Sequence, residues 1–124
     1  MINLGIVLKN LGEAKAAVAA YEEALGILEA SLDPDHPVIS SALANYGISL
    51  DLEGRHADAE AAHRRSVEIL RSKYGEHPQV ATALENLAVS LRNQARHDDA
   101  FAAYEEALAL RRSLQAEDLS LIHI

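Results

Sequence analysis

Apolar and small residues recur along the chain at intervals of three and four, which is the spacing of one face of an α-helix. One such stripe runs through Leu43, Tyr46, Gly47 and Leu50. Glycine and proline separate the stripes, as expected at helix ends and first helical turns. The pattern predicts an all-α fold with six helices, at residues 1–11, 13–31, 37–53, 56–73, 78–94 and 97–116.

The predicted helices form a repeat. A shift of 42 residues aligns the first copy with the second, and a shift of 41 aligns the second with the third. Small residues should let the two helices of a copy approach closely, with Gly5, Gly47 and Ala88 opposite the rings of Tyr21, His63 and Tyr104. The full set of expected packing residues is Gly5, Ala17, Tyr21 and Ala24, then Gly47, Ala59, His63 and Ser66, then Ala88, Ala100, Tyr104 and Ala107. Each copy is therefore a helical hairpin that only its neighbours can cover.

The repeat divides the chain into an array over residues 1–116 and a tail over 117–124. The copies span residues 1–36, 37–77 and 78–116. The first copy is expected to lack its front turns. Asn3 lies only two residues after Met1, whereas the equivalent Asn45 and Asn86 are each preceded by about seven helical residues. Residues 119–124 match one reading frame of a transposase mosaic-end adapter used in sequencing libraries, so they are expected to be read-through. The alternative is a natural apolar tail that caps the last helix.

The composition and charge of the chain argue against several classes of function. The chain has no Cys, which excludes a disulfide framework and a Cys-based zinc site. With 11 Lys and Arg against 19 Asp and Glu, the formal charge is −8, which opposes nucleic-acid binding. No apolar run approaches the length of a membrane span, and the start lacks the features of a signal peptide. A soluble cytoplasmic protein without a nucleic-acid or membrane partner is expected.

Several segments together resemble the tetratricopeptide repeat, in the 42-residue form found in kinesin light chains and bacterial multidomain regulators. They are Asn3-Leu4-Gly5, Asn45-Tyr46-Gly47, Asn86-Leu87-Ala88, Gly54-Arg55-His56-Ala57-Asp58-Ala59-Glu60, Tyr21-Glu22-Glu23-Ala24-Leu25, Tyr104-Glu105-Glu106-Ala107-Leu108 and the two His-Pro linkers. A HEAT or armadillo array shares the period but not this spacing. The resemblance implies an α-solenoid that forms a right-handed superhelix, with the first helix of each hairpin on the concave wall. It does not imply a motor subunit, since the heptad stalk of kinesin light chain is absent.

The concave wall is the predicted binding surface. Its expected groove residues form an amide column, an apolar column and a charged column, namely Asn3, Asn45 and Asn86, then Ile6, Ile48 and Val89, then Lys9, Asp51 and Arg92. An Asn side chain offers a donor and an acceptor that match an extended peptide backbone. Alternatively, the asparagines stabilise the neighbouring hairpin. Asp51 is expected to neutralise Lys9 and Arg92, which leaves the charge of the ligand open.

These observations predict a non-enzymatic module that binds a protein or peptide in the groove. The six His residues form no His-Glu-x-x-His pair or carboxylate cluster, and no phosphate-binding loop occurs, so no catalytic residue, metal or cofactor is predicted. One alternative is the sensing arm of a larger signalling ATPase, transcriptional regulator or protease whose catalytic domain lies outside these residues. Another is a structural array that self-associates through its uncapped ends.

Overall fold

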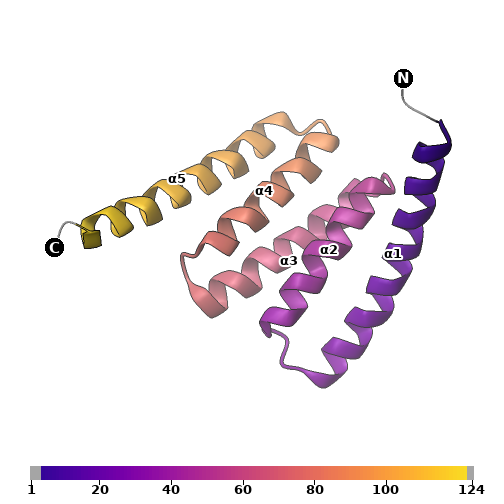
Figure 1. The fold of residues 1–124 in the computed structure, drawn as a ribbon, viewed down its shortest axis with the longest axis horizontal. Coiled ribbons are helices and arrows are strands. Elements are labelled where there is room, and N and C mark those ends of the chain that lie inside the picture. The colour runs from indigo at the N-terminus through magenta and orange to yellow at the C-terminus, as the bar shows by residue number, and fades with distance from the viewer. Residues whose placement is uncertain (1–3, 123–124) are drawn as a thin grey trace.

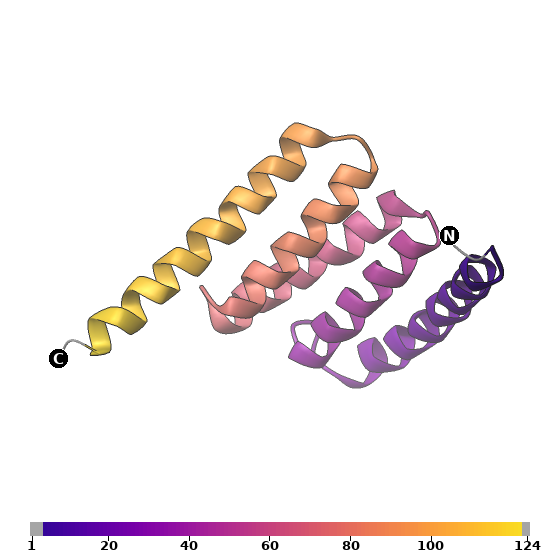
Figure 2. The ribbon, with the colours of Figure 1, turned by 45° about the horizontal axis from the view of Figure 1, so that its top comes forward.

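The chain folds into a row of helices. The computed structural model describes the backbone of residues 4–122 and the side chains of residues 11–119. Over this range the helices are α1 (Leu4–Ser31), α2 (Pro37–Leu52), α3 (His56–Tyr74), α4 (Pro78–Asn93) and α5 (His97–Ile122). They follow one another across the molecule in chain order, so that α1 and α5 form its two ends (Figure 1, Figure 2).

The helices are arranged in two unequal layers. Each helix packs against its neighbour in the chain, and α2 also packs against α4. Among the described residues, the backbones of α1, α3 and α5 make no corresponding contacts with one another. Because α2 and α4 are drawn together while the other helices spread apart, the array curves with α2 and α4 on its inner side. The fold is an α-solenoid of antiparallel hairpins, as the sequence predicts.

Histidine and proline start the two inner helices. His36 and His77 are the N-cap residues of α2 and α4, and the Nδ1 atom of each accepts a hydrogen bond of 3.1 Å from the backbone N–H two residues later. Pro37 and Pro78 follow at the first helical position, where a missing N–H leaves no intrahelical bond unmade. The His-Pro linkers are therefore helix-start signals.

The corners after α2 and α4 share one geometry. Gly54 and Ala95 have positive φ angles of 87° and 60°. The next residue, Arg55 or Arg96, donates its backbone N–H to Leu50 or Leu91 at 2.8 and 3.0 Å. Each of these arginines also bonds a carboxylate three residues later, Asp58 or Asp99. The corner thus needs a residue that tolerates positive φ, followed by an Arg and an Asp.

The expected corner at Gly12 is absent, which corrects the prediction of two helices over residues 1–31. Helix α1 is continuous from Leu4 to Ser31. The positions that hold Arg55 and Asp58 in the second copy are Glu13 and Ala16 in the first. This copy therefore lacks the side-chain pair that closes the other corners, and the run of alanine and glutamate around it favours an unbroken helix.

The continuous helix also overturns the expected pairing of Gly5 with Tyr21. The two residues lie on the same helix, separated by about 24 Å along its axis at the usual rise. Ala17, Tyr21 and Ala24 consequently do not pack against a first helix of their own copy. They are half-buried on the side of α1 that faces α2.

In the second and third copies the expected packing residues are buried or half-buried. Ala59, His63 and Ser66 are buried in α3, and Ala100 and Ala107 are buried in α5, while Tyr104 is half-buried. Gly47 is buried directly against His63: a Cβ added there would lie 2.5 Å from the Cε1 atom of the ring. Ala88 is also fully buried.

Helix α5 begins at His97 as predicted, but it ends at Ile122 rather than at 116. Residues 117–122 thus extend the last helix instead of leaving it. Leu119 is 49% exposed, and the side chains of the remaining tail residues, 120–124, lie outside the described range. No helix in the described part of the chain is long and apolar enough to cross a membrane.

Candidate functional site: the groove between α2 and α4

Two hollows lie end to end between α2 and α4, with α3 beneath them. The first has a volume of about 210 Å³ and is lined by Ile48, Asp51, Leu52, His63, Asn86, Val89 and Asn93. The second has about 220 Å³ and is lined by Ser40, Ser41, Ala44, Ser66, Leu70, Gln79, Thr82, Ala83 and Asn86. Asn86 lines both hollows, so together they form one groove along the inner layer, here called the α2–α4 groove.

The groove contains four of the nine residues predicted from the sequence, which are Ile48, Asp51, Asn86 and Val89. Asn45 is exposed on α2 but lines neither hollow. It precedes Leu52 by seven residues, so the two share one edge of α2 and Asn45 lies on the rim of the groove. Asn3 lies outside the described residues, as do the side chains of Ile6 and Lys9.

The alternative explanation for the asparagines finds no support in the described residues. The side chains of Asn45 and Asn86 make no hydrogen bond there, whether to a neighbouring hairpin or within their own. Asn45 is exposed and Asn86 is half-buried between the two hollows. Both amides therefore keep their donors and acceptors for an outside group.

Sequence reasoning placed Arg92 in the groove, whereas the structure places Asn93 there. The three residues predicted on α4, one from each column, are spaced by three: Asn86, Val89 and Arg92. A helix turns once in 3.6 residues, so a step of seven returns to nearly the same face and a step of six does not. Leu52 was missed for a similar reason, because it lies four residues after Ile48. Spacings of three and four in alternation identify both residues.

Asp51 does not neutralise Arg92 as expected. Among the described residues, no Lys or Arg nitrogen lies within 4.0 Å of its carboxylate. Its Oδ1 instead lies 2.8 Å from the Nδ1 atom of His56, and its Oδ2 accepts a hydrogen bond of 2.5 Å from the hydroxyl of Ser90. Through these contacts Asp51 joins α2, α3 and α4. Its side chain is only 11% exposed and lies beneath the groove.

His63 forms the floor of the first hollow and is 1% exposed. Its Nε2 atom lies 3.7 Å from Oδ2 of Asp51, which is too long for a direct hydrogen bond. Neither ring nitrogen has a hydrogen-bond partner among the described residues. Burial lowers the pKa of His63, and this effect outweighs the nearby carboxylate of Asp51, which acts to raise it. The ring is therefore neutral at physiological pH.

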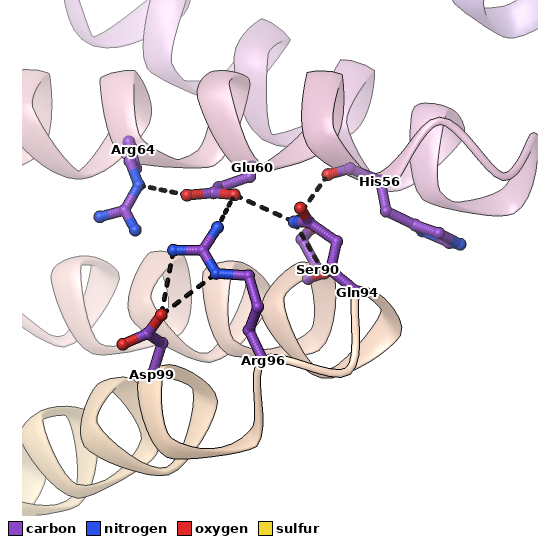
Figure 3. Close-up of polar contacts among 7 residues, drawn as sticks. All are labelled: His56, Glu60, Arg64, Ser90, Gln94, Arg96 and Asp99. Atoms are coloured by element: carbon purple, nitrogen blue, oxygen red, sulfur yellow. Dashed lines mark hydrogen bonds and ion pairs between the residues drawn. The ribbon is translucent and has the colours of Figure 1, made fainter.

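A polar cluster beside the groove fixes α3 against the third repeat. Glu60 of α3 lies between Arg64 and Arg96, at 2.8 and 2.6 Å (Figure 3). Gln94 donates to Glu60 at 3.0 Å and also to the backbone carbonyls of His56 and Ser90. Burial acts to raise the pKa of Glu60, but the hydrogen bonds from Gln94 and Arg64 and the charges of its arginine partners lower it overall. The cluster joins α3 to the end of α4 and to the corner before α5.

The described residues include no group of three or more His, Asp and Glu side chains that could hold a metal ion. The polar groups of the groove are amides, hydroxyls, one carboxylate and one imidazole. Between them run apolar side chains, among them Ile48 and Val89. Such a surface can offer hydrogen bonds to a peptide backbone and pockets to its side chains.

Comparison with known proteins agrees with this architecture. A search of curated proteins finds no significant match to the chain. A family model of the tetratricopeptide repeat matches residues 1–72 and 53–113. These matches cover most of the sequence, including both inner helices and the groove between them. The chain therefore belongs to the tetratricopeptide repeat family, whose repeats generally mediate protein–protein interaction.

Proposed function

We propose that the protein is a non-enzymatic interaction module that binds an extended peptide segment in the α2–α4 groove. The observation that carries this proposal is the position of Asn86, whose unpaired amide lies between the two hollows. A peptide backbone that crosses the groove would meet this amide midway, with one of its side chains in each hollow. The repeat subtype proposed for the array is the 42-residue form.

The shape and spacing of the groove support an extended ligand. Side chains on the same side of an extended peptide are about 7 Å apart, since each residue adds about 3.3 Å. Two hollows that share one lining residue suit alternate side chains of such a segment. Asn45 on the rim provides a second amide for the same backbone.

The test uses peptides selected on the intact protein from a displayed random-sequence library. Replacement of Asn86 by Ala should weaken a selected peptide by about 1–2 kcal/mol, the value for lost backbone hydrogen bonds, and Asn45→Ala should have a smaller effect because it lies on the rim. Titration calorimetry measures both affinities. Gln115→Ala, which removes an exposed amide of α5, is the matched control. Unchanged affinity in Asn86→Ala, with normal thermal unfolding, would reject the groove as the binding surface.

A further inference from the structure

The carboxylate beneath the groove is enclosed by groups that carry no permanent positive charge. Asp51 is 11% exposed, and its partners are the hydroxyl of Ser90 and the imidazoles of His56 and His63. A buried carboxylate is normally paired with a cation, because its desolvation is otherwise costly. No described Lys or Arg lies within ion-pairing distance, so no lysine or arginine of the described chain supplies the positive charge that would normally pair with this carboxylate.

His63 adds an acceptor beside that carboxylate. It is 1% exposed, it lines the same hollow, and neither of its ring nitrogens has a hydrogen-bond partner in the described part of the chain. A buried polar group of this kind is normally satisfied, so an unsatisfied nitrogen beside a hollow indicates a missing donor. A neutral imidazole can present one nitrogen as an acceptor.

The walls of the hollow are apolar above this polar floor. Ile48 and Leu52 of α2 face Val89 of α4, while the amides of Asn86 and Asn93 complete the lining. The volume of about 210 Å³ is smaller than the pockets that hold small-molecule ligands. It suits a single long side chain with an apolar stem and a polar end.

We propose that this hollow is a pocket for a lysine side chain of the bound peptide, with its ammonium group against Asp51 and its methylene stem between Ile48 and Val89. The inference rests on the proposed function of the groove.

Lysine is favoured over arginine because both carboxylate oxygens already have a partner, which leaves no free edge for a bidentate guanidinium. A compact ammonium with three donors needs only single acceptors, which Asp51, His63 and the amides of Asn86 and Asn93 provide. The net charge of −8 attracts such a peptide.

The experiment titrates n-butylammonium chloride, which reproduces the lysine side chain, into the intact protein and follows the ring signals of His63 by NMR. The neutral n-butanol and the n-butylguanidinium ion are titrated in parallel. Butylammonium should shift the His63 signals saturably, and the other two should bind roughly tenfold more weakly or worse, because they lack the charge or the compact head. Equal binding of butylammonium and butanol would overturn the proposal.

Asp51→Asn keeps the size of the side chain and removes its charge, and it should weaken butylammonium roughly tenfold or more. Asp98→Asn, at the exposed start of α5, is the matched control and should change nothing. If Asp51→Asn unfolds, Val89→Phe fills the hollow while Asp51, Ser90 and both histidines stay in place, and it should abolish the shifts caused by butylammonium. Retained binding in either folded variant would contradict the proposal.

Selected peptides separate this inference from the function on which it rests. Replacing the lysine of a bound peptide by norleucine should weaken it roughly tenfold or more. A peptide that binds the groove with equal affinity after this change overturns the lysine pocket and leaves the groove function intact. If no peptide binds the groove while butylammonium is still held at Asp51, the groove function fails and the ammonium site remains.

Discussion

At the scale of single residues, His63 occupies a position that holds tyrosine in the other two copies. The ring is 1% exposed and has no hydrogen-bond partner in the described part of the chain, and this burial disfavours its charged form. The same burial that makes it part of the core also places a titratable group beneath the groove. His63 thus combines a core-packing position with a place on the floor of the candidate groove.

Acidification should therefore destabilise the protein through His63. Its folded-state pKa lies below the unfolded value of 6.5, so the unfolded state binds the proton more readily. The contribution of the neutral ring to stability is complete above pH 6.5 and is lost as the pH falls from there toward the lowered pKa. Urea unfolding at a series of pH values measures the slope.

The variant His63→Phe is the control for this pH series, because it keeps a ring and removes the titration. It should show a smaller loss of stability over the same interval. An identical pH dependence in both proteins would show that His63 is not the source of the effect.

The ring of His63 leaves no space for a side chain at Gly47. Gly47→Ala should lower the free energy of unfolding by about 1–3 kcal/mol, since the new Cβ would lie 2.5 Å from the ring of His63. Gly26→Ala is the matched control: it is also helical, its surroundings are open, and it should be neutral or stabilising. Chemical denaturation compares the two, and equal effects would show that His63 does not confine the site.

At the scale of whole elements, α1 differs most from expectation. If the helix is continuous through Gly12, then Gly12→Ala should raise the free energy of unfolding by about 0.5–1 kcal/mol, as for any exposed helical glycine. A corner there would need a positive φ angle and would give the opposite sign. Gly54→Ala provides that comparison, because Gly54 has a φ of 87° and should lose stability on substitution. Denaturation curves of both variants measure the signs.

The inner helices were predictable because local signals agree with their packing. The ends predicted for α2, α3 and α4 each lie within one residue of the observed ones, and all but the end of α4, where Ala95 takes the place of glycine, are marked by proline or glycine. The repeat alone was a poor guide at α1. Gly12 aligns with Gly54, but the Arg55–Asp58 hydrogen bond at that corner has no counterpart in the first copy.

The candidate site was predictable in outline only. Repetition located the inner helices and the amide of Asn86, but the surroundings of Asp51 come from three helices that are distant in sequence. Its expected neutralisation assumed that side chains in one column touch one another. Equivalent positions in successive repeats face the same side without being in contact, so the buried partner Ser90 was not identified.

At the scale of the whole molecule, the repeats are held together by a few polar junctions as well as by the core. Glu60→Gln should lower the free energy of unfolding by about 1–3 kcal/mol near neutral pH, since the side chain is 15% exposed and receives charged hydrogen bonds from Arg64 and Arg96. Because the pKa of Glu60 is lowered, this stabilisation exists above its unfolded value of 4.5 and is lost on acidification through the folded value. Denaturation at neutral and acidic pH measures both effects.

For this prediction the comparison is Glu68→Gln, an exposed glutamate of the same helix, which should have little effect. A difference between the two variants that persists unchanged at acidic pH would contradict the assignment to the ionised carboxylate.

The outer helices are joined differently from the inner ones. Arg65 of α3 pairs with Glu29 of α1 at 2.5 Å, and Arg71 of α3 pairs with Glu106 of α5. All four side chains are between 39% and 50% exposed, so dissolved salt screens these ion pairs far more than the buried contacts between α2 and α4. We therefore expect ionic strength to change the spacing of the outer helices more than that of α2 and α4, so that the α2–α4 groove keeps its width.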